Sequence, residues 1–165
     1  MLHHVSIGVR DVERAARFYD AALGALGYRR LAEYMPYAIA YGVSAPAFWV
    51  QLPHNQQESN PGNGMHVGFS AKNKGAVHKF HEAALANGGK DDGAPGPRDM
   101  YGPDYYGAFV IDLDGNKLEA TLHTEVARAV PTKRRAKTKG SKKKPVGKSA
   151  KKRSKRPAKR KARRK

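Results

Sequence analysis

The stretch His4-Val5-Ser6-Ile7-Gly8-Val9-Arg10-Asp11 guides the interpretation of this chain, because it returns 62 positions later as His66-Val67-Gly68-Phe69-Ser70-Ala71-Lys72-Asn73. Both copies begin with histidine, alternate along a strand and run into a helix start. The same offset relates further pairs: Phe18 and Phe80, Leu23 and Leu85, and Gly27 and Gly89. A repeat of this length predicts two fused modules of one small fold.

The first half of the chain predicts a β-α-β-β-β module. After the strand at 3–9, Asp11 can cap a helix whose apolar stripe ends at Gly27. Proline and turn residues then separate three short strand candidates, at 28–34, 37–43 and 47–52. Residues 53–64 have no periodicity and are interpreted as a linker.

The second half repeats this order less clearly. It predicts a strand at 65–71, a helix at 74–87 and two strands, at 105–112 and 117–123, joined by a hairpin at Asp114-Gly115. Residues 91–104 are rich in Gly and Pro and predict a loop, long enough to be a mobile rim, in place of a strand.

The net charge of +18 is unevenly distributed along the chain. Residues 133–165 hold 20 of the 32 Lys and Arg and no acidic residue, which leaves 12 basic and 14 acidic residues in 1–132. We therefore predict one domain at 1–131, made of modules 1–53 and 64–123. It is followed by a disordered Lys/Arg-rich tail at 132–165, because such a segment has no apolar surface to bury.

The chain has no cysteine, which excludes disulfides and thiolate sites and leaves His and carboxylate as metal ligands. It has neither a signal-peptide pattern at its start nor an apolar run near the ~20 residues that a bilayer requires. We expect a cytoplasmic protein with no membrane partner, with nucleoid or nuclear association through the tail as a further option.

Three residues are candidate metal ligands: His4 and His66, which open equivalent strands, and Glu119, on the last predicted strand. Two imidazoles and a carboxylate suit Fe(II), Mn(II), Zn(II) or Ni(II). Each residue alone has a plainer interpretation as a packed or solvated side chain. The repeat strengthens the ligand hypothesis, because it gives the two histidines equivalent positions.

The two histidine strands and the hairpin Phe109-Val110-Ile111-Asp112-Leu113-Asp114-Gly115-Asn116-Lys117-Leu118-Glu119 resemble the vicinal oxygen chelate superfamily over residues 2–123. This group includes glyoxalase I, extradiol dioxygenases, thiol transferases and bleomycin-binding proteins. The resemblance implies an α+β fold in which paired β-α-β-β-β modules form a curved open-barrel cup, within one chain or between the chains of a homodimer. It also implies a metal held by His4, His66 and Glu119.

The resemblance leaves the fourth ligand position open, since either Trp49 or Gln51 can face the site from the strand at 47–52. With Trp49 there, the site has three ligands, closer to the dioxygenase or thiol-transferase pattern than to glyoxalase. Glu119 and Tyr106 are the catalytic candidates, the tyrosine as a phenolic acid. The other candidates for contact with a substrate are Trp49, Gln51, Arg98, Tyr101, Tyr105 and His123.

Three functional hypotheses follow. The first is a metal-dependent enzyme of this superfamily, a lyase, dioxygenase or thiol transferase, that acts on a small oxygen-chelating substrate. The second is a metal-free module that binds a small ligand. The third is a nucleic-acid-associated protein whose basic segment at 133–165 binds a polyanion by counterion release.

Overall fold

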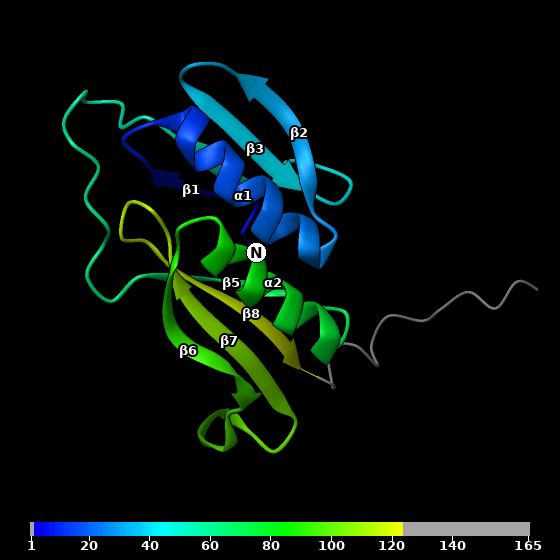
Figure 1. The fold of residues 1–165 in the computed structure, drawn as a ribbon. Helices are drawn as coiled ribbons and strands as arrows, with labels where there is room; N and C mark the ends of the chain where they lie inside the picture. Colours follow the sequence, from blue (N-terminus) through cyan, green and yellow to red (C-terminus); the bar gives the residue numbers. More distant parts are fainter. Residues whose placement is uncertain (1, 124–165) are drawn as a thin grey trace, which may run out of the picture. The chain divides into compact units, whose positions relative to one another are not determined.

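The computed structural model describes residues 2–123, in which the order β-α-β-β-β occurs twice (Figure 1). Module 1 contains β1 (Val5–Gly8), α1 (Val12–Leu26), β2 (Arg29–Tyr34), β3 (Ala38–Gly42) and β4 (Phe48–Gln51). Module 2 contains β5 (His66–Ser70), α2 (Lys74–Ala86), β6 (Lys90–Pro97), the 3-10 turn η1 (Asp99–Tyr101), β7 (Tyr105–Ile111) and β8 (Lys117–His123). The predicted α+β class and the duplication are confirmed. The predicted domain boundary at 131 and the basic tail lie outside the described residues.

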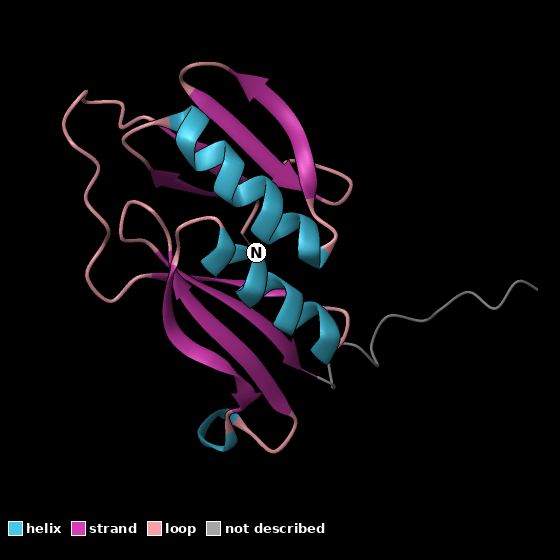
Figure 2. Ribbon diagram, viewed as in Figure 1, coloured by secondary structure: helices cyan, strands magenta, loops and turns pink. Residues whose placement is uncertain are grey.

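Each module forms a four-stranded sheet, with strand orders β1-β4-β3-β2 and β5-β8-β7-β6. In both sheets the first strand runs parallel to the last, and the remaining neighbours are antiparallel. A helix covers one face of each sheet (Figure 2). We call the opposite face of each sheet its open face.

The helices begin and end where the sequence predicts. The Asp11 side chain accepts a hydrogen bond from the Arg14 backbone N–H at 2.9 Å, and Gly27 ends α1 in the left-handed region at φ 88°. In module 2, Asn73 caps α2 and Gly88 follows its end at φ 92°. Neither helix has the length and apolarity needed to cross a membrane.

One core serves both modules. Helix α1 packs against α2, and the repeat partners Phe18 and Phe80 are both completely buried. The Phe48 ring of module 1 meets the Phe69 ring of module 2 edge to face, with centroids 5.0 Å apart. The helix-covered faces of the sheets therefore supply the core, and the open faces remain for other uses.

A buried carboxylate, Asp112, joins the modules. It is 5% exposed and accepts a hydrogen bond of 2.5 Å from the Tyr19 hydroxyl of α1. The backbone N–H groups of Asp114 and Asn116 also donate to it, at 2.9 and 2.7 Å. Burial and the neighbouring carboxylate raise the pKa of Tyr19 well above its ordinary value, so its hydroxyl keeps the proton that it donates.

The same hairpin makes a second contact with module 1. Arg10 donates from Nε to Asp114 at 2.7 Å, and its backbone N–H donates to the same oxygen at 3.1 Å. The Asn116 side chain donates to the Gly8 carbonyl at 3.3 Å. The Asp-Gly-Asn hairpin thus connects two modules as well as two strands.

The prediction of a loop at 91–104 is wrong for its first half, where β6 pairs with β7. The pairing shifts register around Gly93, and β6 lies at the edge of its sheet. Prolines are tolerated at an edge and at irregularities, because no neighbouring strand needs their missing N–H. The proline and glycine content of these residues therefore predicted a loop where the chain forms an irregular edge strand.

We expect Asp112→Ala to destabilise the protein by about 2–4 kcal/mol, because it leaves the buried Tyr19 hydroxyl and two turn N–H groups without their acceptor. Chemical denaturation followed by far-UV circular dichroism measures this change. Asp104→Ala, at an exposed position, is the control and should stay within about 0.5 kcal/mol of the parent. Equal stabilities for the two variants would refute the joining role of Asp112.

Candidate functional site

Glu119 of β8 lies at the centre of a cluster of polar side chains on the open face of module 2. This residue is 3% exposed, although its side chain is a carboxylate. The Tyr105 hydroxyl donates to Oε1 at 2.6 Å, and Nε2 of His66 lies 3.4 Å from Oε2. We call these three residues the half-site, since the candidate ligand His4 is not among them.

Strand alternation places the half-site on the open face. Leu118 and Ala120, on either side of Glu119, are completely buried in the core. Glycines on the two flanking strands leave room for the carboxylate: a Cβ at Gly68 would lie 3.5 Å from Oε2, and one at Gly107 only 3.1 Å from Oε1. A Cβ at Gly107 would push against Glu119, whereas one at Gly68 would be in ordinary contact with it.

The surroundings of the half-site are aromatic and cationic. The Phe109 ring, opposite Glu119 in the β7–β8 ladder, lies edge-on to His66. The Lys117 ammonium lies 4.9 Å and the Arg98 guanidinium 5.5 Å from the Phe109 ring centroid. A cavity of about 540 Å³ opens here, lined by His66, Phe109, Lys117, Tyr101 and residues 61–65.

The hydrogen bond to Glu119 also affects the Tyr105 hydroxyl. Burial, and after it this bond, raise the pKa of Tyr105 above its ordinary value. The hydroxyl is therefore a protonated donor at neutral pH. It fixes one oxygen of Glu119 and leaves the other oxygen directed at His66.

The catalytic prediction of Tyr106 requires correction, because Tyr106 points to the helix-covered face. Its hydroxyl lies 2.8 Å from His78 Nε2 on α2, and the Lys74 ammonium lies 4.9 Å from its ring centroid. Adjacent residues of a strand face opposite ways, so one of the two tyrosines had to point away. Tyr105 is the one at the half-site.

Strand register decides which of Trp49 and Gln51 occupies the position in module 1 that Glu119 occupies in module 2. In the parallel pairs, Gly68 lies beside Glu119 and Ser6 lies beside Trp49. Ser6 and Gly68 are equivalent at the offset of 62, so Trp49 is the module 1 counterpart of Glu119. Gln51 lies one pleat further along, beside Gly8, as the counterpart of Thr121.

The three candidate ligands do not meet within one chain. His4 is exposed, and its Nδ1 lies 2.8 Å from Nδ1 of His3. Among residues 2–123, no group of three or more His, Asp or Glu side chains is arranged to hold a metal ion. Only the pair of His66 and Glu119 comes together from the predicted set.

This pair has the spacing of two metal ligands. Bonds of about 2.1 Å at tetrahedral or octahedral angles separate neighbouring donor atoms by about 3.0–3.4 Å. The measured separation of 3.4 Å fits this range. The hydrogen bond from Tyr105 to the other carboxylate oxygen is the kind of outer contact that orients a ligand. The spacing of this pair is therefore compatible with two donors of a metal site.

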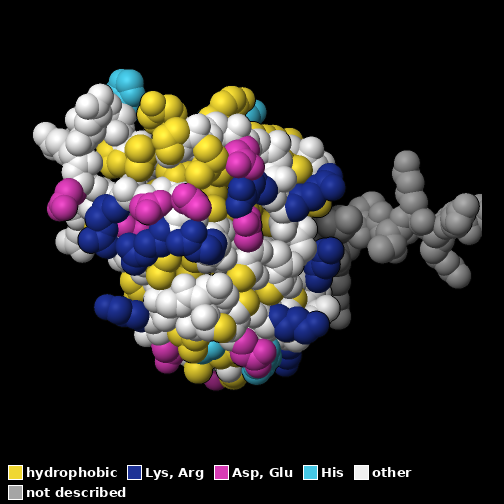
Figure 3. Space-filling view, turned by 45° about the horizontal axis from the view of Figure 1, so that its top comes forward, with side chains coloured by type: hydrophobic (Ala, Val, Ile, Leu, Met, Phe, Trp, Pro, Cys, Tyr) yellow, Lys and Arg dark blue, Asp and Glu magenta, His cyan; other side chains and the backbone are white. Residues whose placement is uncertain are grey.

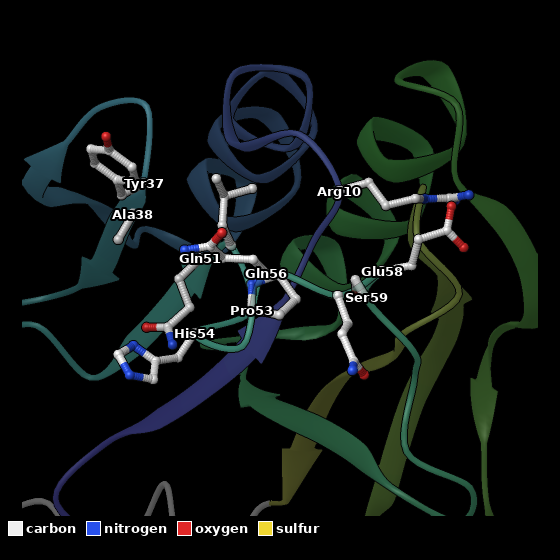
Figure 4. Close-up of a pocket in the computed structure, with 11 residues that line it drawn as sticks. Arg10, Tyr37, Ala38, Gln51, Pro53, His54, Gln56, Glu58 and Ser59 are labelled. Atoms are coloured by element: carbon white, nitrogen blue, oxygen red, sulfur yellow. The ribbon is translucent and has the colours of Figure 1, made fainter.

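A second cavity, of about 930 Å³, lies at the end of module 1 (Figure 4). Tyr37 and Ala38 from β3 and its preceding turn, Gln51 from β4 and linker residues such as His54 line it. Arg10 also borders this cavity, with its guanidinium held by Asp114.

Three predicted residues remain, Arg98, Tyr101 and His123, and of these Tyr101 lines the cavity beside His66. Arg98 donates to the carbonyls of Ala94 and Pro97, and Tyr101 packs edge-on against Tyr105 with centroids 5.1 Å apart. His123 ends β8, opposite Tyr105 in the backbone register. Two residues of the site were missed, Phe109 and Lys117. Their even spacing from Glu119 across the predicted hairpin is the signal that could have identified them.

A family model and a solved structure both relate this chain to one superfamily. Residues 1–120 match the family model described as Glyoxalase/Bleomycin resistance protein/Dioxygenase superfamily. A glyoxalase/bleomycin resistance protein from Albidiferax ferrireducens is 38% identical, covers 74% of this chain and 98% of its own, and superposes with a TM-score of 0.68.

More distant structures share the fold. A glyoxalase-related enzyme from Fulvimarina pelagi is 21% identical, with a TM-score of 0.60 and coverage of 75% of this chain and 88% of its own. A glyoxalase I mutant from Zea mays is 22% identical, with a TM-score of 0.58 and coverage of 76% and 47%. No functionally curated protein matches significantly.

We expect Glu119→Gln to lower the pKa of Tyr105, because it removes the negative charge that holds the phenolic proton. The pKa should stay above the ordinary value, since burial, the larger cause, remains. A pH titration of ¹³C-labelled tyrosine rings by NMR measures it. Glu82→Gln, on the exposed side of α2, should leave the titration unchanged, and an unchanged titration in Glu119→Gln would contradict the assignment.

Proposed function

Because this chain belongs to the Glyoxalase/Bleomycin resistance protein/Dioxygenase superfamily, we propose that it is a metal-dependent enzyme whose site is shared between two copies of the chain. The carrying observation is the half-site: a buried carboxylate spaced as a metal ligand from His66 and held by Tyr105. Burying a carboxylate without a compensating cation is costly, which supports a metal beside Glu119. The substrate would be a small molecule with adjacent oxygen atoms.

The proposal of a shared site rests on how the modules pair. Within one chain they pair through α1 and α2, and His66 and Glu119 lack a third ligand among residues 2–123. His4, on the open face of module 1, is exposed and is the natural third donor. In a homodimer, module 1 of one copy can face module 2 of the other, so that His4 of the first meets the half-site of the second.

The residues would then have distinct roles. His4, His66 and Glu119 would hold the metal, which would polarise the substrate oxygens as a Lewis acid. Tyr105 would keep Glu119 oriented and hold a proton at the carboxylate, within reach of a substrate oxygen. Arg98 and Lys117 would border the substrate on the Phe109 side.

We expect the purified protein to contain a stoichiometric divalent transition metal and the variants His4→Ala, His66→Ala and Glu119→Gln each to lose most of it. The histidine variants leave two donors in place of three, and Glu119→Gln replaces an anionic oxygen donor with a neutral one, so each variant should bind the metal more weakly. Elemental analysis and calorimetric titration with Zn(II) or Mn(II) measure it. His54→Ala, in the linker, is the histidine control and should retain the metal.

The shared site is tested by mixing the His4→Ala and Glu119→Gln variants in equal amounts while the subunits exchange. Half of the dimers are then mixed, and each mixed dimer has one intact site, so about a quarter of the sites should recover metal. No recovery would point to a site within one chain. Absence of metal from the parent protein, after growth with metal supplements, would overturn the enzyme proposal in favour of metal-free ligand binding.

We also propose that residues 133–165 bind polyanions without sequence preference, on the strength of their 20 basic residues and absence of acidic ones. The full chain should bind double-stranded DNA with an affinity that falls steeply with salt, measured by fluorescence anisotropy. A chain that ends at Pro131 should not bind, because residues 1–132 carry more acidic than basic groups. Equal binding by both chains would refute this role of the basic segment.

A further inference from the structure

Two aromatic rings lie stacked on the open face of module 1. The rings of Trp49 on β4 and Tyr34 on β2 have centroids 6.0 Å apart and planes 21° apart. Tyr34 is 62% exposed, and Trp49 is partly exposed. Part of this near-parallel aromatic pair is therefore exposed to solvent.

The strand between them explains how the rings meet. β3 lies between β2 and β4 and presents Ala38 and Ala40 on this face, opposite Gln51 and Trp49. Small side chains let the indole lie over β3 and reach the ring of Tyr34. In module 2 the counterpart of Ala40 is Phe109, so this open surface is a property of module 1 alone.

The ring pair is not needed for the core. Phe48 and Val50, on either side of Trp49, point to the helix-covered face and are 4% and 0% exposed. The hydrophobic contacts that stabilise module 1 are therefore made on its other face. In the upper part of Figure 3, hydrophobic side chains gather over module 1, whose β2–β3 hairpin exposes Tyr34, Met35 and Tyr37.

Polar groups adjoin the rings. The cavity of about 930 Å³ shown in Figure 4 begins at Tyr37 and Ala38 and contains the side chains of Gln51 and His54. Gln51 is the next open-face residue after Trp49 on β4. A ligand lying on the rings can thus hydrogen-bond at one end to an amide and an imidazole.

We propose that Trp49 and Tyr34 form a stacking platform for the planar, unsaturated part of the ligand. This inference deepens the proposed function and rests on it for one point: in a shared site, the platform stands where the fourth metal ligand would come from. The protein then selects ligands whose adjacent oxygens are conjugated to a flat ring, and Trp49 replaces a metal donor with a stacking surface.

Trp49 is the single tryptophan of the chain, so its fluorescence reports on the platform directly. The probes are benzoylformate and cyclohexylglyoxylate, which share a 2-oxo acid group and differ in having a flat or a puckered ring. We expect benzoylformate to bind about three- to tenfold more tightly by calorimetry, the range typical of an aromatic pair, and to quench Trp49. Equal affinities, or no binding of either probe, would overturn the proposal.

Substitutions test whether Trp49 is the source of the preference for benzoylformate. Trp49→Leu should abolish the preference for benzoylformate, whereas Trp49→Phe, which keeps a flat ring, should retain most of it and also controls for folding. Tyr106→Phe removes a hydroxyl on the opposite face and should leave the preference unchanged. A preference that survives in Trp49→Leu would show that stacking on Trp49 is not its source.

A further experiment can refute the proposal of the platform and the proposal of the metal site independently. Titrations are made with the protein as purified and after chelation by EDTA. If the protein as purified, after growth with metal supplements, holds no metal and still prefers benzoylformate, the platform stands and the metal-dependent enzyme is refuted. Bound metal without any preference for the flat ring keeps the enzyme and refutes the platform.

Discussion

The hydrogen bond between the Tyr19 hydroxyl and the Asp112 carboxylate is the interaction on which the arrangement of this protein depends. It connects α1 of one module to the hairpin of the other at a buried position, where an unmatched partner is costly. The hairpin that Asp112 organises also carries Asp114, which holds Arg10. The same hairpin starts β8, so the position of Glu119 follows from how the modules are joined.

The two modules have diverged on their open faces while keeping the same backbone. Module 2 has a carboxylate on its last strand and a phenyl ring beside it, at Glu119 and Phe109. Module 1 reverses the sizes, with an indole at Trp49 and a methyl group at Ala40. The open face of module 2 therefore carries a carboxylate at its centre, and the open face of module 1 carries an indole at the equivalent place.

Much of the fold could be predicted from the sequence, because strand alternation, caps and the offset of 62 are local signals. The strand β6 could not, since its pairing depends on a neighbour that tolerates bulges at Gly93. For the site, the sequence named both His66 and Glu119 as candidate ligands, and their side chains lie 3.4 Å apart. It could not say whether His4 would join them, because this depends on how whole modules pair. The choice between Tyr105 and Tyr106 required the register of a strand.

The linker between the modules, residues 52–65, sets the concentration at which each module encounters the other. Joining the two modules in one chain makes the pairing of α1 with α2 intramolecular, at an effective concentration in about the millimolar range. The pairing therefore does not weaken on dilution, and the shared core with its contact between Phe48 and Phe69 persists in a single molecule. Any association between copies, by contrast, obeys mass action. Activity that depends on such association would rise faster than in proportion to the amount of protein.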